Sequence, residues 1–204
     1  MDNREKILSC ALRLFYHKGY DAVGVQEIAT AAGVTKPTLY YYFGSKHGLL
    51  ESVVRQHAAR LFSALDEARI FDGDLRHTLV RVARVYSHFS MEDREFYFFM
   101  LSMMYSARES ETFQTIHPLI VQQHQLIAQI FLQAEADPST PLTGRHHRMS
   151  AAFTGMINHY MLMVFETGGR LEAISEEVMD ALVHQFLYGI DLPDPSPQTK
   201  KEPT

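Results

Sequence analysis

The side chains of residues 35–46 could contact the phosphates and bases of a nucleic acid. This stretch, TKPTLYYYFGSK, contains Lys36, Thr38, Lys46 and three consecutive tyrosines. Lysine and threonine reach phosphate oxygens or base edges, and tyrosine hydroxyls can bond phosphates. Because neighbouring residues of an α-helix point in different directions, some of these rings must face outward. The outer face of this segment is therefore a candidate DNA contact surface.

The residues before the tyrosines predict a helix-turn-helix that would position them. Ala29, Gly33 and Leu39 are spaced four and six residues apart. A small residue at 29 lets a second helix cross closely, Gly33 can adopt a positive φ in the turn, and Leu39 anchors the second helix in the core. Thr35 is placed to cap that helix, and Pro37 suits its first turn.

Leu39 and Phe43, four residues apart, are expected to face the core. The outer surface would then present Lys36, Pro37, Thr38, Tyr41 and Tyr42, with Tyr40 at the edge. Ser45 is placed to cap the next helix, whose first amides and Lys46 would form a phosphate site. The alternative is a three-helix packing unit whose exposed aromatic patch binds another protein.

Residues 7–50 resemble the DNA-binding domain of TetR-family transcriptional regulators. The matching motifs are LF…GY at Leu14, Phe15, Gly19 and Tyr20, EIA…AGV at residues 27–34, TLY at residues 38–40, and F.SK at Phe43, Ser45 and Lys46. The resemblance implies DNA contacts from Gln26, Thr35, Lys36, Pro37, Thr38, Tyr40, Tyr41, Tyr42 and Lys46.

Four residues depart from the usual pattern of this family. Gly24 replaces a frequent Ser or Thr, which weakens the cap of the second helix, and Gly48 replaces an acidic residue of the capping box. Pro37 and Tyr42 stand where Gly or Ala, and His, are common. These changes leave the fold intact but alter the face that would read the DNA.

Helical periodicity dominates the chain, and the pattern predicts an all-α protein of about nine helices. The expected helices span 3–18, 25–32, 36–42, 46–69, 73–90, 93–108, 110–135, 143–167 and 174–190, separated by Gly, Pro and Asp-rich turns. We expect a helix-turn-helix domain at 1–45 and a helical ligand-binding and dimerisation domain at 46–190. The Pro-rich segment 191–204 is expected to be disordered.

The larger domain contains a possible ligand pocket. Residues 94–108 are apolar nearly all round, which indicates a central helix, and their methionines could adapt to ligands of several shapes or simply fill the core. The expected lining is Tyr86, Phe89, Met100, Met103, Met104, His117 and His124. The two histidines are seven residues apart, ~10 Å along a helix, which is too far to chelate one metal ion. No metal or cofactor is expected.

The last two helices are candidates for a dimer interface, because the resemblance implies that they pair with their copies in a partner subunit. The residues expected there are Ala151, Gly155, Val178, Leu182 and Phe186. Small residues such as Ala151 and Gly155 would permit close helix approach. Burial of both helices within one subunit is the alternative.

Composition excludes several other classes of protein. A single cysteine precludes an internal disulfide and fits a reducing cytoplasm, and no apolar run is long enough to span a bilayer. Residues 1–60 contain eight Lys or Arg and five Asp or Glu, a balance of +3, whereas the remainder carries −8. A basic head on an acidic body is compatible with a nucleic-acid module, but on the charge balance alone chance drift in surface charge is the favoured explanation.

The sequence therefore favours a cytoplasmic, homodimeric regulator that binds a double-stranded DNA operator, acts as a repressor, and is released by a small, mostly apolar ligand. An all-α enzyme using Glu166, His159 and Tyr160 is the rival hypothesis, but no nucleophile motif, metal triad or phosphate loop supports it. A constitutive DNA-binding protein without a ligand is the third possibility.

Overall fold

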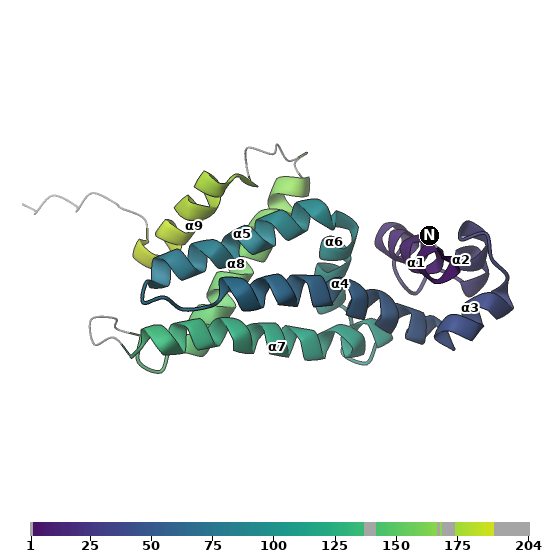
Figure 1. Cartoon of the computed structure of the whole chain (residues 1–204), viewed down its shortest axis with the longest axis horizontal. Helices are drawn as coiled ribbons and strands as arrows, with labels where there is room; N and C mark the ends of the chain where they lie inside the picture. The colour runs from purple at the N-terminus through teal and green to yellow at the C-terminus, as the bar shows by residue number, and fades with distance from the viewer. Residues whose placement is uncertain (1, 137–141, 167, 169–173, 190–204) are drawn as a thin grey trace, which may run out of the picture.

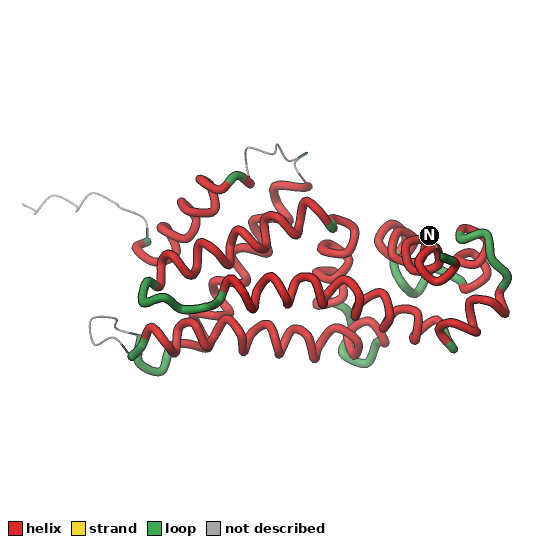
Figure 2. Tube along the Cα trace, in the orientation of Figure 1, coloured by secondary structure: helices red, strands yellow, loops and turns green. Residues whose placement is uncertain are grey.

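The computed structural model describes residues 2–136, 142–166, 168 and 174–189, and every regular element among them is a helix (Figure 1, Figure 2). The helices are α1 Asn3–Lys18, α2 Val25–Ala31, α3 Lys36–Phe43, α4 Lys46–Ala68, α5 Leu75–Glu92, α6 Arg94–Met104, α7 Glu111–Ala134, α8 His146–Glu166 and α9 Glu176–Tyr188. The expected all-α class is confirmed over this part of the chain. The expected tail at 191–204 lies outside the described residues.

Helix α6 is shorter than expected, because it ends at Met104 and not at residue 108. The amide of Tyr105 donates to the carbonyls of Ser102 and Met103, which tightens the last turn. The hydroxyls of Ser102 and Ser106 donate to the carbonyls of Phe99 and Met103 at 2.7 Å each. Serine hydroxyls that bond carbonyls of the preceding turn compete with helix continuation.

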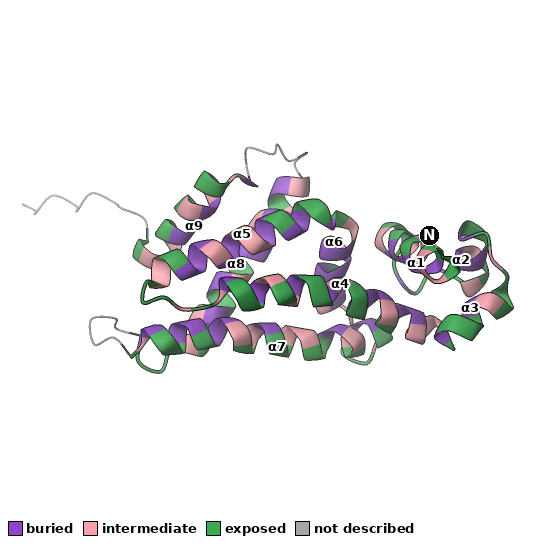
Figure 3. Ribbon diagram, in the orientation of Figure 1, coloured by how far each residue is buried: buried purple, intermediate pink, exposed green. Residues whose placement is uncertain are grey.

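Helices α1, α2 and α3 form a small head that packs around apolar side chains of α1. Ile7, Ala11 and Phe15 of α1 are fully buried, as are Ile28 of α2 and Leu39 of α3. The ribbon coloured by burial shows buried and exposed stretches alternating along the helices of the head (Figure 3).

The turn between α2 and α3 depends on Gly33. Its φ is +66°, a conformation that glycine adopts without steric cost, as the sequence predicted. The Gly33 amide donates to the Thr30 carbonyl at 3.1 Å, and the Val34 amide donates to the Ala29 carbonyl at 2.9 Å. These bonds use the last carbonyls of α2 and set the angle at which α3 leaves the turn.

Helix α4 joins the head to the larger body (Figure 1). Its 23 residues give a rod of about 35 Å, since an α-helix rises about 1.5 Å per residue. In the body, α7 lies along α4 and α8, while α9 packs mainly on α5. Buried side chains form one continuous cluster through head and body. The proposed boundary at residues 45 and 46 therefore stays a prediction.

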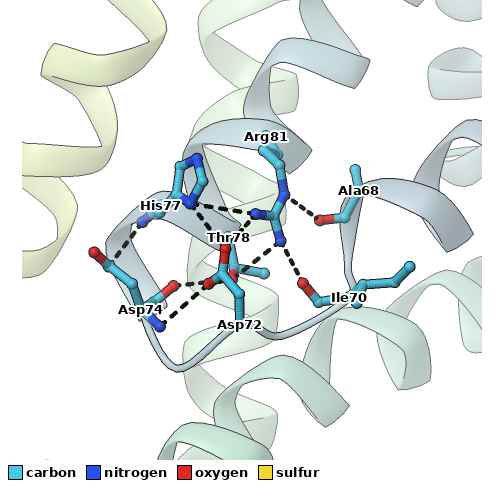
Figure 4. A network of polar contacts seen from close by, with 7 residues as sticks. All are labelled: Ala68, Ile70, Asp72, Asp74, His77, Thr78 and Arg81. Atoms are coloured by element: carbon cyan, nitrogen blue, oxygen red, sulfur yellow. Dashed lines mark hydrogen bonds and ion pairs between the residues drawn. The ribbon is translucent and has the colours of Figure 1, made fainter.

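A polar network holds the turn between α4 and α5 (Figure 4). Arg81 of α5 donates through Nη1 to Asp72 Oδ2 at 2.7 Å and through Nε to the Ala68 carbonyl at 3.2 Å. A further Arg81 nitrogen donates to the Ile70 carbonyl. The hydrogen bond from Arg81 and the backbone amide of Asp74 hold the pKa of the Asp72 carboxyl well below its usual range.

Candidate DNA-binding face and ligand cavity

The start of α3 is fixed by the cap that the sequence predicted. Thr35 is the N-cap residue, and its hydroxyl accepts a hydrogen bond from the Thr38 amide at 3.3 Å. The Thr35 and Thr38 hydroxyl oxygens are also 2.8 Å apart. Pro37 lies in the first turn, where an amide would have no helical partner. The Thr38 hydroxyl is thus held toward the cap, which leaves its methyl group as the freer contact.

The three tyrosines differ in how far they project from α3. Leu39 is fully buried and Phe43 nearly so, as expected for the inner face. Tyr41 is 84% exposed, whereas Tyr40 and Tyr42 are 41% and 40% exposed. The rings of Tyr41 and Tyr42 meet edge to face, with centroids 5.4 Å apart. Tyr41 is therefore the outermost aromatic side chain of this helix.

The other predicted DNA contacts of the head lie on α3, its cap or the preceding helix. Thr35, Lys36 and Pro37 are exposed, and so is Gln26 of α2, which makes only a local bond with Thr30 at 3.5 Å. Gly24 caps α2 without a side-chain hydrogen bond, as expected. An apolar inner face thus holds a polar and aromatic outer face in one orientation.

Lys46 has a partner within the protein that its sequence context does not indicate. Its Nζ lies 4.1 Å from the centroid of the Tyr20 ring, a distance typical of a cation–π contact. Ser45 caps α4 as predicted, and its Oγ accepts from the Gly48 amide at 2.9 Å. A phosphate contact from Lys46 stays a prediction, and it would compete with the Tyr20 ring.

The backbone around Gly48 leaves no room for a side chain. The sequence showed only that glycine replaces the usual acidic residue of the capping box at this position. A Cβ atom at this position would lie 2.2 Å from the Phe43 carbonyl oxygen, far inside van der Waals contact. The end of α3 and the first turn of α4 can approach this closely only because residue 48 has no side chain. Gly48 thus fixes the orientation of the proposed recognition helix relative to α4.

A cavity of about 250 Å³ opens between α6, α7 and α8 in the body. Leu101, Met104 and Tyr105 contribute from α6 and the turn after it, and Ile120, Gln123 and His124 from α7. Helix α8 adds Ala151, Thr154, Gly155 and Asn158. A much smaller cavity of about 10 Å³ lies beside it, lined by Met100, Met104, Ile120, Gln123 and residues of α4.

The predicted ligand residues divide between the cavities and the core. Met104 and His124 line the cavity of about 250 Å³, and Met100 lines the one of about 10 Å³. Phe89 and Met103 are buried away from both. Tyr86 is fully buried behind the wall, where its hydroxyl accepts from Gln123 Nε2 at 2.7 Å.

The prediction for His117 is wrong. This residue is exposed, and its ring packs against Phe113 with centroids 5.1 Å apart. On this part of α7 the buried residues are Ile116 and Gln123. His117 directly follows Ile116, and successive helix residues point about 100° apart, so His117 lies on the outer surface.

His124 is held by two neighbours in the wall of the cavity. Its Nε2 lies 3.2 Å from His147 Nδ1, and its Nδ1 lies 3.2 Å from Ser150 Oγ. Burial, followed by the charge of His147, lowers the pKa of His124. No cluster of three or more metal-ligating side chains occurs in the described parts of the chain.

Three residues of the predicted dimer interface have other neighbours within the subunit, and their place in an interface stays a prediction. Ala151 and Gly155 are exposed at the rim of the cavity that they help to line. Phe186 packs against Phe131 and Phe153, with ring centroids 6.2 and 5.5 Å away. Val178 and Leu182 of α9 are half-buried and remain candidates for contact with a second subunit.

Three contacts join the head and the first turn of α4 to α6 and α7. The Tyr20 hydroxyl donates to the Glu111 carboxylate in the first turn of α7. His47 Nε2 lies 3.1 Å from Thr115 Oγ1 of α7. The Phe15 ring of α1 stacks on Phe99 of α6, with centroids 5.8 Å apart. Both helices that contact the head also line the cavity.

Comparison with known proteins identifies the head as a recognised module. Residues 7–53 match the model of the bacterial regulatory proteins of the tetR family. The uncharacterized HTH-type transcriptional regulator YvkB of Bacillus subtilis is 26% identical, over 86% of this chain and 89% of its own length. Among the described residues, no helix is long and apolar enough to cross a membrane.

Solved structures share the whole architecture. The TetR family transcriptional regulator PfmR from Thermus thermophilus superposes with a TM-score of 0.75 at 25% identity, covering 95% of this chain and 100% of its own. The transcriptional regulator FadR from Bacillus subtilis, solved in complex with stearoyl-CoA, has a TM-score of 0.78 at 16% identity over 91% and 98% of the two chains. The helix-turn-helix geometry and the family match identify residues 7–53 as a DNA-binding domain of the tetR family, in a chain whose whole architecture is similar to that of TetR-family transcriptional regulators.

Proposed function

We propose that the chain is a homodimeric transcriptional repressor that a small, mostly apolar ligand releases from a palindrome-like operator. The observation that carries the DNA-binding part is the outer face of α3. There a buried Leu39 and Phe43 hold Tyr41 at 84% exposure beside exposed Lys36 and Pro37. Exposed aromatic side chains gathered on one helix face mark an interaction site, the lysine beside them suits a phosphate partner, and the major groove of DNA admits one helix.

The DNA contacts are proposed on α3, its cap and the first turn of α2. They are Gln26, Thr35, Lys36, Pro37, Thr38, Tyr40, Tyr41 and Tyr42, with Lys46 at the start of α4. Lysines and tyrosine hydroxyls would bond phosphates and set the register, while the Thr38 methyl and Pro37 would contact base edges. Residues 1–60 carry a balance of +3 on a chain whose net charge is −5, so the head would attract DNA while the body would not.

The ligand would act through α6 and α7, which both extend from the cavity to the head. Met104 at the end of α6 lines the cavity, and Phe99 of the same helix stacks on Phe15 of α1. Helix α7 places Gln123 in the cavity and Glu111 on Tyr20. A ligand that shifts either helix would reorient the head, to the extent that its affinity differs between the two arrangements.

A dimer is supported by half-buried apolar residues on the last helices. Val178 and Leu182 of α9 are half-buried, and Met163 of α8 is 43% exposed. We propose this outer face of α8 and α9 as the interface, together with the exposed Ala151 and Gly155 and the half-buried Phe186. Two heads would then bind successive major grooves ~34–36 Å apart.

An acyl-type molecule is one candidate ligand, because the FadR structure from Bacillus subtilis contains stearoyl-CoA. The sulfur and hydrocarbon surfaces of Leu101, Met104 and Ile120 in the cavity would suit an apolar chain. Burial of apolar ligand surface at roughly 25 cal/mol per Å² could exceed the few kcal/mol that separate two conformations.

Selection of bound duplexes from a random library, followed by fluorescence anisotropy and light scattering, tests this function. We expect enrichment of a sequence with two-fold symmetry, a dimer in solution, and an affinity that falls steeply with salt through counterion release. An enzyme with an unrelated substrate would enrich no sequence and show no such salt slope. A monomer that binds a single half-site would contradict the dimer while leaving the DNA-binding face in place.

A further inference from the structure

The walls of the 250 Å³ cavity contain no residue with a fixed charge. The side chains that α6, α7 and α8 supply are aliphatic, thioether, aromatic, amide, hydroxyl and imidazole groups. A charged ligand group that entered would lose its hydration without gaining a counter-ion, which costs several kcal/mol. Electrostatics therefore favours a ligand with no net charge in the part that is enclosed.

Two buried amide side chains in the cavity wall, Gln123 and Asn158, each bond a tyrosine hydroxyl through one end of the amide and leave the other end without that partner. Gln123 is 6% exposed and donates from Nε2 to the Tyr86 hydroxyl at 2.7 Å. Asn158 is 8% exposed, and its Oδ1 accepts from the Tyr97 hydroxyl at 2.8 Å. The Gln123 carbonyl oxygen and the Asn158 amino group remain to serve the cavity, one as an acceptor and the other as a donor.

The tyrosine partners keep these amides oriented. Burial raises the pKa of both the Tyr86 and the Tyr97 phenols well above the usual value, so both hydroxyls keep their protons. The Tyr97 hydroxyl donates to Asn158 Oδ1, which leaves the Asn158 amino group turned away from Tyr97, whereas the Tyr86 hydroxyl accepts from Gln123 Nε2 and leaves the Gln123 carbonyl oxygen turned away. The donor and the acceptor that the cavity offers are accordingly built into the fold.

Thr154 supplies a third group on the same side. Its Oγ1 is buried and makes no hydrogen bond to any described part of the chain, although the residue lines the cavity. A buried hydroxyl without a partner costs about 1–3 kcal/mol. It sits one helical turn from Asn158 on α8, so the two side chains face the same direction.

His124 does not add a charge or a free nitrogen to this set. Ser150 Oγ donates to the His124 carbonyl at 3.0 Å, so the Ser150 oxygen is left to accept from His124 Nδ1. His124 Nε2 then accepts from His147 Nδ1. Both ring nitrogens are therefore hydrogen-bonded in a neutral tautomer. Burial, followed by the charge of His147, lowers the pKa of His124, which also favours the neutral ring.

We infer that the cavity binds a neutral molecule with an apolar body and, at one end, a hydrogen-bond donor next to an acceptor, as in a primary amide or lactam. The donor would bond the Gln123 carbonyl, and the acceptor would bond the Asn158 amino group and the Thr154 hydroxyl. This inference rests on the proposed ligand-responsive function, because it specifies the chemistry of the ligand at the same site.

Isothermal titration of the full chain with three matched probes tests this chemistry. Cyclohexanecarboxamide, cyclohexanecarboxylate and cyclohexylmethylammonium share a ring and differ in charge and in donor–acceptor pattern. At neutral pH we expect the amide to bind at least tenfold more tightly than either ion. Equal or tighter binding of an ion, or binding of stearoyl-CoA with no measurable binding of the amide, would overturn the inference.

Two substitutions locate the probe. Thr154→Val keeps the shape of the side chain and removes the hydroxyl, so we expect it to weaken amide binding about fivefold, the effect of one hydrogen bond. Thr143→Val, in the exposed turn before α8, is the matched control and should change nothing. Gln123→Glu should shift the preference from the amide toward the ammonium probe, and a melting curve confirms that this variant folds.

Unchanged amide affinity in Thr154→Val would place the site elsewhere and contradict the assignment. Anisotropy with the selected operator is measured on the same samples without probe. Loss of the proposed DNA-binding function would appear there as no duplex binding, whereas failure of the present inference would appear only in the titrations.

Discussion

Single side chains decide whether the proposed recognition helix is presented correctly. The sequence predicted the inward Leu39 and Phe43, the Thr35 cap and the positive φ of Gly33, because these follow from local periodicity and backbone sterics. The sequence did not predict that Lys46 contacts the Tyr20 ring, or that the Phe43 carbonyl oxygen lies close to Gly48. Both depend on where the start of α4 meets other elements, which local pattern does not encode.

Gly48→Ala should disturb the α3–α4 turn. The added Cβ would meet the Phe43 carbonyl oxygen at 2.2 Å, so one helix has to shift although alanine favours helices. We expect a loss of stability of about 1–3 kcal/mol, as for other overpacked sites, together with weaker operator binding. Urea unfolding measures the first effect and anisotropy the second. Gly155→Ala, at a helical glycine with open space around it, is the control and should not destabilise the protein.

At the scale of elements, breakers and periodicity predicted the helices, but not their partners. The helical set follows from Gly, Pro and Asp at the turns, while α6 ends early through its own serines. The cavity residues Gln123, Thr154 and Asn158 were missed. The sequence alone does not show whether an isolated polar residue of a helix faces solvent, bonds a buried tyrosine or lines a cavity, because that depends on the tertiary structure.

The turn between α4 and α5 should lose stability in acid through Asp72. Its folded-state pKa is depressed by Arg81, so the stabilisation is present above the unfolded pKa of about 3.9 and is lost as pH falls toward the folded value. Wild type should therefore exceed Asp72→Asn in stability at pH 7, and the difference should shrink below about pH 4. Urea midpoints at several pH values measure it. A pH-independent difference would contradict this account; Glu67→Gln is the exposed control.

The contact between Tyr20 and Glu111 should hold the head against α7. Burial, together with the hydrogen bond to Glu111, raises the pKa of the Tyr20 phenol, which therefore stays a donor. Tyr20→Phe removes one bond to a carboxylate, an effect of about 1.5–3 kcal/mol. We expect faster amide hydrogen exchange in α1, α2 and α3 and unchanged exchange in α5 and α9. Tyr16→Phe in α1 serves as the control. Uniformly faster exchange would show global destabilisation instead.

The whole molecule combines a slightly basic head, an acidic body and a long helix that joins them (Figure 1). Two contacts, Phe15 with Phe99 and Tyr20 with Glu111, link the head to the helices that line the cavity. The proposed repression and its release by a ligand require these parts to act together, and both depend on one claim. That claim is that the outer face of α3 binds DNA.

Operator affinity of Tyr41→Ala, compared with Tyr105→Ala, tests this claim most directly. The two tyrosines are 84% and 86% exposed, so neither substitution should affect stability much, but only Tyr41 lies on α3. In anisotropy measurements without ligand, we expect Tyr41→Ala to bind the selected operator about tenfold more weakly and Tyr105→Ala to match wild type. Equal affinity of all three proteins, at equal melting temperatures, would contradict the assignment of α3 as the DNA-binding face.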